Sequence, residues 1–114
     1  MDERLAQALE TSNLMVVINQ QKRILREQYQ ASLVHYSKGC QFTATQELIS
    51  FCSSMLQLGQ TQSVVLDDNG IPALIENLQD FTNDLVETYA SATNTYYSKY
   101  EGLKKQRSVE GILA

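Results

Sequence analysis

The sequence predicts a mostly α fold in a single domain of residues 1–114. It combines two long helices packed side by side, a shorter helix between them in sequence, and a small β-hairpin. Apolar residues recur every three or four positions over two long stretches, which is typical of one face of a helix. One proline and five glycines leave few interruptions in 114 residues. An Asn-Gly step between two short apolar runs predicts the hairpin.

The first helix is expected from about Asn13 to Lys38, with Gly39 as its C-terminal cap. Its apolar stripe consists of Leu14, Ile18, Leu25, Tyr29, Leu33 and Tyr36, and Val17 and Ile24 widen it. The apolar residues Leu5, Ala8 and Leu9 indicate a helical segment before this one. Thr11-Ser12-Asn13 is either a break or an N-cap between the two segments, and the pattern leaves both open.

The second helix is expected to begin at the segment Thr43-Ala44-Thr45-Gln46, which fits a capping box, and to run to about Leu58 before Gly59. Glu47 is the only charged residue in it. An almost uncharged helix is expected to be covered on more than one side.

The hairpin is expected to pair residues 63–66 with residues 71–75 across the turn Asp67-Asp68-Asn69-Gly70. Pro72 cannot donate a ladder hydrogen bond, so its strand should be short or lie at an edge. The alternative begins the last helix early, with Pro72 in its first turn. The hairpin is favoured because Ile71 would be a poor N-cap.

The last helix is the clearest element, and Asn77 is its expected N-cap. Its stripe consists of Leu78, Phe81, Leu85, Tyr89, Ala92, Tyr96, Tyr100 and Leu103. Acidic side chains lie near its start and basic ones near its expected end at Gln106, which would complement the helix dipole. These are Asp80, Asp84 and Glu87, then Lys99, Lys104, Lys105 and Arg107.

The expected helix lengths point to contacts beyond one compact domain. A helix from Asn77 to Gln106 would be about 45 Å long, whereas a compact domain of this size is about 34 Å across. Either the two long helices form an elongated pair, or their ends pack against something else.

Composition excludes several classes of protein. Nine Lys and Arg against 13 Asp and Glu give a net charge of −4, which argues against a duplex-binding domain. No apolar run is long enough to span a membrane, and Met1-Asp2-Glu3-Arg4 does not start a signal peptide, so a cytoplasmic location is expected.

No chemistry-bearing motif stands out. His35, Cys40 and Cys52 lack zinc-ligand spacing, and we expect two buried thiols and a surface or capping histidine. The Asp67 turn fails as a calcium loop, because Ile71 and Leu78 occupy positions that need oxygen donors. We therefore expect no enzyme activity, no metal and no cofactor.

A protein interface is the use that the sequence favours. Tyrosine is enriched at interfaces, and Tyr97 lies off the apolar stripe. The segment 108–114 carries three aliphatic residues and is expected to fold back or to dock into a neighbour. The expected partner-binding residues are Tyr96, Tyr97, Tyr100, Lys104, Val109, Ile112 and Leu113. The partner would be a second copy or another protein in a larger assembly; nucleic acid is the less favoured partner, approached through the basic side chains.

The C-terminal half resembles small proteins of contractile-tailed phages that infect marine cyanobacteria. The resemblance is carried by the segment Val64 to Pro72 and by the last helix, with Ala92, Asn94, Tyr96, Tyr97, Tyr100, Leu103, Lys104 and the ending Arg107-Ser108-Val109. It implies a non-enzymatic virion component, an assembly factor or a small regulator of host machinery, located in the virion or in the host cytoplasm. It implies no functional residue.

Overall fold

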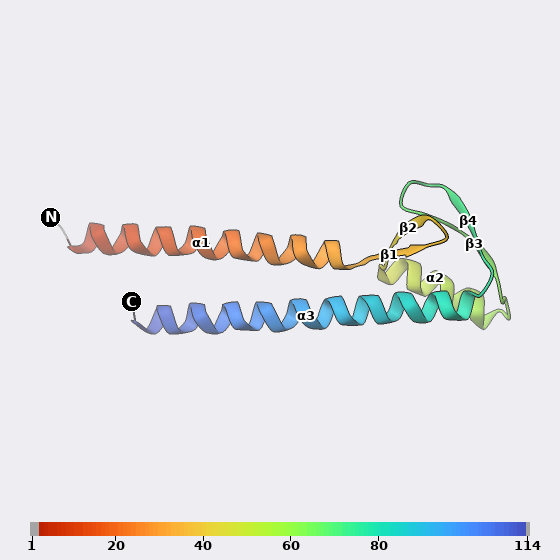
Figure 1. The fold of residues 1–114 in the computed structure, drawn as a ribbon. Coiled ribbons are helices and arrows are strands. Elements are labelled where there is room, and N and C mark those ends of the chain that lie inside the picture. Colours follow the sequence, from red (N-terminus) through yellow and green to blue (C-terminus); the bar gives the residue numbers. More distant parts are fainter. Residues whose placement is uncertain (1–2, 114) are drawn as a thin grey trace. The chain divides into compact units, whose positions relative to one another are not determined.

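The structure, a computed structural model, describes residues 3–113 and the side chains of residues 3–106. Within these residues it contains three helices and two antiparallel two-stranded sheets, so the predicted mostly α fold is confirmed (Figure 1). The elements are α1 (Glu3–Ser32), β1 (Val34–Ser37), β2 (Cys40–Thr43), α2 (Gln46–Gln57), β3 (Ser63–Leu66), β4 (Pro72–Ile75) and α3 (Leu78–Leu113).

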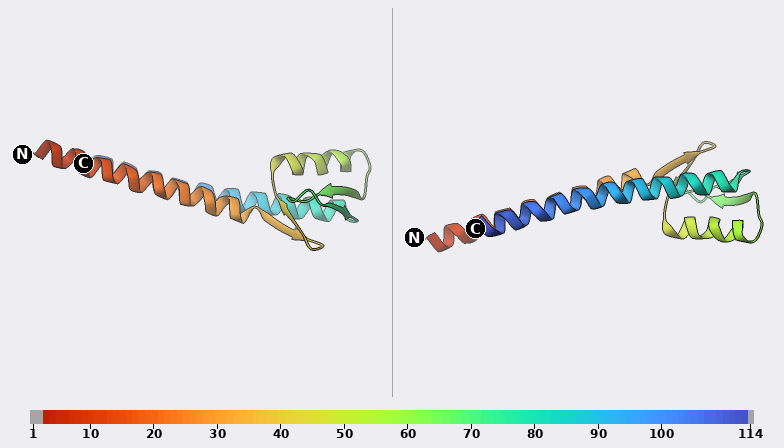
Figure 2. Two further views of the ribbon diagram at one scale, coloured as in Figure 1. Left: turned by 90° about the horizontal axis from the view of Figure 1, so that it is seen from above. Right: turned by 90° about the horizontal axis from the view of Figure 1, so that it is seen from below.

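Contacts divide the chain into two compact units, and both long helices contribute to each. The helix-pair unit comprises residues 1–29 and 95–114, where α1 and α3 run antiparallel and side by side (Figures 1 and 2). The hairpin unit comprises residues 30–94, with both hairpins, α2 and the first turns of α3.

The hairpin unit has a continuous apolar core. The β3–β4 hairpin lies over the layer that α2 and the start of α3 form (Figures 1 and 2). The largest fully buried side chains of the core of the hairpin unit are Phe42, Leu78, Leu85 and Cys52. Phe42 packs edge-on against Phe81, with 5.0 Å between ring centroids. This core combines residues from β2, α2, β3, β4 and α3.

The first helix ends earlier than predicted, and a hairpin that the sequence analysis missed follows it. α1 stops at Ser32, and Val34–Ser37 pairs with Cys40–Thr43. Lys38 and Gly39 connect these strands with φ of 52° and 76°, the two positive angles that a tight hairpin turn requires. Gly39 therefore does adopt a positive φ, but in a hairpin turn and not as a helix cap.

α1 is continuous at its other end. Helix extends without interruption from Glu3, so Thr11-Ser12-Asn13 is neither a break nor an N-cap. The early helical segment and the first helix are one element. Ile18 is its one buried residue among those described.

α2 begins two residues later than the capping box suggests. Thr45, not Thr43, is the N-cap, and its hydroxyl accepts a hydrogen bond from the Leu48 amide at 3.1 Å. Thr43 instead lies in β2. The expectation of coverage on more than one side is also wrong, because Cys52 faces the core while Phe51 is 45% exposed.

The β3–β4 hairpin is confirmed over the early helix start. Ser63 pairs with Ile75 and Leu66 with Pro72. Asp67 shapes the turn, because its buried carboxylate accepts hydrogen bonds from the amides of Asn69 and Ile71 at 2.9 and 2.8 Å.

α3 has the predicted cap and the predicted buried face. Asn77 Oδ1 accepts a hydrogen bond from the Asp80 amide at 3.1 Å, and every residue of the predicted stripe is buried or half-buried. The helix continues to Leu113, beyond the expected end at Gln106. The backbone of the predicted docking tail is thus helical as far as Leu113, while its side chains lie outside the described ones.

Candidate protein-interaction surface

The inner face of the helix-pair unit is built from aliphatic and tyrosine side chains. Ile18 of α1 and Leu103 of α3 are buried. The Tyr29 and Tyr96 rings lie 4.8 Å apart, and Tyr96 packs edge-on against Tyr100 at 6.2 Å. These offset and edge-on arrangements are the favourable geometries for aromatic pairs.

Four of the predicted partner-binding residues are therefore divided between two roles. Tyr96 and Tyr100 are half-buried within the unit and pack against their own chain. Tyr97 is 67% exposed and is free to meet a partner. Lys104 is exposed and lies 3.5 Å from Glu101. The side chains of Val109, Ile112 and Leu113 lie outside the described ones, so their predicted role stays a prediction.

Basic side chains surround this inner face. The Lys22 ammonium lies 5.9 Å from the Tyr100 ring centroid, a cation–π distance. Lys99 Nζ donates a hydrogen bond to Gln28 Oε1 at 3.3 Å. Because α3 continues to Leu113 and the dipole acts only within the last turn, helix-dipole stabilisation does not account for Lys99 and Lys104.

α1 exposes apolar side chains that sequence reasoning did not assign to a site. Six of them have exposed fractions between 45% and 57%: Leu5, Leu9, Met15, Val16, Val17 and Ile24. Scattered exposed aliphatics are ordinary on a protein surface, but six on one helix make α1 a candidate contact surface. The sequence did carry a signal for this surface, because the apolar residues of α1 are too many to lie on a single face of the helix.

Between the two helices lies an open depression of about 280 Å³. It is lined by Gln21, Ile24, Leu25, Lys99, Leu103 and Gln106. Amides, aliphatic carbons and one ammonium line it, and this set holds no nucleophile or acid–base pair.

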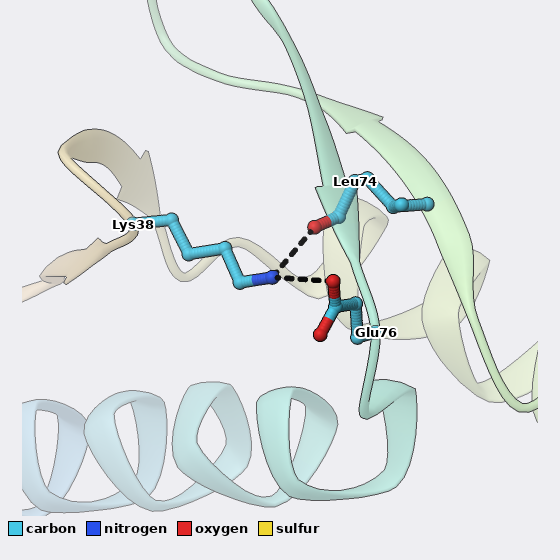
Figure 3. A network of polar contacts seen from close by, with 3 residues as sticks. All are labelled: Lys38, Leu74 and Glu76. Carbon is cyan, nitrogen blue, oxygen red and sulfur yellow. Dashed lines mark hydrogen bonds and ion pairs between the residues drawn. The ribbon is translucent and has the colours of Figure 1, made fainter.

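In the hairpin unit, polar side chains serve to join loops and strands. Lys38 Nζ, at the β1–β2 turn, donates to the Leu74 carbonyl at 3.3 Å and lies 3.6 Å from Glu76 Oε1 (Figure 3). The outward side chains of β3 and β4 are nevertheless apolar and exposed, including Val64, Leu66 and Leu74. This hairpin is thus apolar on both faces.

The titratable residues occupy structural positions. His35 lies in β1, three residues after the end of α1, and it is neither a cap nor fully on the surface: it is half-buried, with its ring centroid 5.8 Å from that of Phe81. Burial raises the pKa of the Cys52 thiol above its ordinary value, and a hydrogen bond with Thr82 opposes part of that rise. Cys40 is only half-buried, so the expectation of two buried thiols holds for Cys52 alone.

Two further kinds of feature, a metal site and a membrane-spanning helix, are absent from the described residues. In the part of the chain that the structure describes, no three His, Cys, Asp or Glu residues form a group that could hold a metal ion. No helix there is both long and apolar enough to cross a bilayer.

The chain was also compared with models of known protein families, with curated proteins and with solved structures, and none of them matches it. The fold and the exposed surface are therefore the basis for a proposal about function.

Proposed function

We propose that this protein is a non-enzymatic protein–protein interaction or assembly component, which docks through the helix-pair unit. The observation that carries the proposal is the row of large apolar side chains that α1 leaves 45–57% exposed, together with Tyr97 on α3. Covering exposed apolar area of this kind lowers the free energy of the system, because the area is removed from water, and this favours the binding of a partner.

We still propose that α3 contributes to docking, but through fewer of its residues than the sequence analysis expected. Of the three tyrosines proposed to bind a partner, Tyr97 faces solvent, whereas Tyr96 and Tyr100 stabilise the helix pair. Val109, Ile112 and Leu113 stay in the proposed docking segment on the strength of the sequence alone. The resemblance to small phage proteins is consistent with this role, and we propose a virion or assembly component as its setting.

The proposal is tested by measuring mass in two ways. Light scattering on a size-exclusion column gives the absolute mass of the purified chain at two salt concentrations. Cross-linking in cells of the natural source gives the mass of any adduct that contains the chain. We expect at least one measurement to give a discrete species heavier than 12.9 kDa. A monomer in both would contradict the proposal.

A matched variant tests the part of the surface on α3. Tyr97→Ala combined with deletion of residues 109–114 should weaken association and leave helix content, measured by circular dichroism, almost unchanged. Tyr96→Ala is the contrasting variant, because it removes a half-buried ring that contacts Tyr29 and should lower stability. If the truncated variant associates as strongly as the native chain, α3 does not contribute to the docking surface.

A second candidate function is supported by the charge distribution. Residues 1–29 and 95–114 carry eight Lys and Arg and six Asp and Glu, a net +2, whereas residues 30–94 carry one Lys and seven acids, a net −6. A regulator that binds nucleic acid or an acidic host protein would use this basic unit. Its binding should fall steeply with added salt, whereas apolar docking should change little.

A further inference from the structure

Four of the six large apolar residues that α1 exposes fall on a continuous stripe, which also carries two amide side chains. Its members recur at steps of four, four, three, four and four residues, and each is exposed. We call it the outer stripe: Leu5, Leu9, Asn13, Val16, Gln20 and Ile24. Steps of three and four keep side chains on one helix face, so the stripe runs for about 29 Å along α1. It lies apart from the inner face that carries Ile18 and Tyr29.

The outer stripe has the composition of a helix–helix seam. Four of its six members are aliphatic and the other two, Asn13 and Gln20, are uncharged. Coiled-coil seams combine aliphatic residues with an occasional buried amide, which selects one register over others. Because α1 uses its other face to contact α3, the stripe is available to another molecule.

The stripe matches itself when it is reversed. If two copies of α1 lie antiparallel about a point midway between Leu14 and Met15, Leu5 is level with Ile24 of the partner, Leu9 with Gln20, and Asn13 with Val16. Each amide then lies beside an aliphatic residue, and no member is left without a counterpart. An interface between two identical chains related by a two-fold axis requires a patch with this self-complementarity.

The charge of α1 matches the same arrangement. Residues 1–14 carry three acids and one base, a net −2, and residues 15–29 carry three bases and one acid, a net +2. Packed helices lie about 8–10 Å apart, close to the Debye length of about 8 Å at physiological salt, so these net charges are only partly screened from one another. An antiparallel pair places each acidic half against a basic half. A parallel pair would place like charges together.

We propose that a second copy of this chain covers the outer stripe, with its α1 antiparallel to the first. The inference rests on the proposed interaction function and names the partner and the surface. A heterologous partner would not require a stripe whose spacing is the same in both directions, nor a helix whose two halves carry opposite net charge. The contact forms a two-fold dimer in which two helix pairs meet through α1.

The first experiment compares two neighbouring lysine substitutions in the full chain. Val16 is 53% exposed and belongs to the stripe, whereas Met15 is 50% exposed and lies about 100° away around the helix. By light scattering, the native chain and Met15→Lys should give twice 12.9 kDa, and Val16→Lys should give a monomer of unchanged helix content. A native monomer, or equal masses for the two variants, would overturn the inference.

The second experiment tests orientation and does not depend on a disruptive variant. In a background with Cys40→Ser and Cys52→Ala, Leu9→Cys and Gln20→Cys chains are prepared separately and then mixed under oxidising conditions. The mixture should form a disulfide-linked dimer containing one chain of each kind, and neither chain alone should cross-link. Equal cross-linking of each chain with itself would indicate a parallel pair and refute the antiparallel one.

These outcomes separate the inference from the function on which it rests. If the purified native chain is a monomer but cross-linking in source cells gives a larger adduct, the second-copy inference fails and the interaction function stands. If neither measurement gives a species above 12.9 kDa, both fail.

Discussion

The carboxylate of Asp68 joins the two hairpins of the hairpin unit. Its Oδ1 accepts a hydrogen bond from the Thr43 amide at 3.0 Å, and its Oδ2 accepts bonds from Thr43 Oγ1 at 2.7 Å and Gln41 Nε2 at 3.2 Å. The Asp68 amide also donates to the Gln41 carbonyl at 2.9 Å. The loop after β3 is thereby attached to β2, which is separated from it in sequence by α2.

Asp68→Ala removes the three bonds to the side chain and leaves the backbone bond to Gln41 intact. A typical hydrogen bond contributes about 0.5–1.5 kcal/mol net, and more with a charged acceptor. Asp68 is exposed, so water replaces part of what is lost. We therefore expect the free energy of unfolding to fall by about 2 kcal/mol, which corresponds to a decrease in Tm of about 10 °C for a unit of this size.

The assay is urea unfolding followed by circular dichroism, with Asp68→Asn as the matched control. The side-chain amide oxygen in this control can still accept from the Thr43 amide, so the variant should lose only about 1 kcal/mol. The slope of the unfolding transition should stay constant across all three proteins. A loss below about 0.5 kcal/mol for Asp68→Ala would refute the view that this carboxylate holds the hairpins together.

Three further predictions follow from the packing, the α3 cap and the buried thiol. Leu85→Ala should lower the free energy of unfolding by about 3 kcal/mol because Leu85 is fully buried, while Val86→Ala, at a side chain 45% exposed, should cost under about 1 kcal/mol in the same urea assay. Asn77→Ala should cost about 1 kcal/mol by loss of the N-cap, and Asn77→Ser, whose hydroxyl can still accept from the Asp80 amide, should keep most of that stability; equal losses would rule out capping as the cause. Because the pKa of Cys52 is raised in the folded chain, its thiol ionises more easily in the unfolded chain. The fold therefore keeps its full stability below the ordinary thiol pKa and loses part of it as the pH rises through the raised pKa. The urea midpoint should therefore fall more steeply between about pH 8 and pH 10 for the native chain than for Cys52→Ala, and parallel curves would disprove the assignment.

The elements that the sequence predicted well are those specified by local chemistry. The stripe on α3 follows from side-chain spacing alone, and Asn77 caps the helix through a bond that reaches only three residues. The β3–β4 hairpin follows from a turn in which Asp67 and Gly70 satisfy nearby backbone requirements. Such features depend on residues within one or two turns of chain, so neighbouring sequence is sufficient to predict them.

The β1–β2 hairpin was missed because two structures share its local signals. Leu33 and Tyr36 fit the spacing of a helix stripe, and a glycine with positive φ can end a helix as well as form a hairpin turn. What decides between them is Phe42, which is almost completely buried against Phe81 of α3. That contact joins residues 39 positions apart in the chain, and spacing within a short segment contains no information about it.

The candidate surface was predicted in part. Sequence reasoning selected the tyrosines of the last helix as a group, but it could not separate Tyr97, which faces solvent, from Tyr96, whose ring packs on Tyr29. It did not select the outer stripe of α1, because apolar residues on two faces of one helix resemble a single wide stripe when only their spacing is known. The position of α3 beside α1 determines which face is covered.

The amino-acid sequence alone specified the class of fold, the position of the β3–β4 hairpin, the N-cap of α3 and the face that α3 buries. Each depends on periodicity, turn chemistry or a short hydrogen bond. The place where α1 ends, the face of α1 that stays exposed and the link that Asp68 makes between two hairpins became visible only in the folded chain. Those features depend on contacts between residues distant in sequence, and such contacts form only when the helices and hairpins pack together.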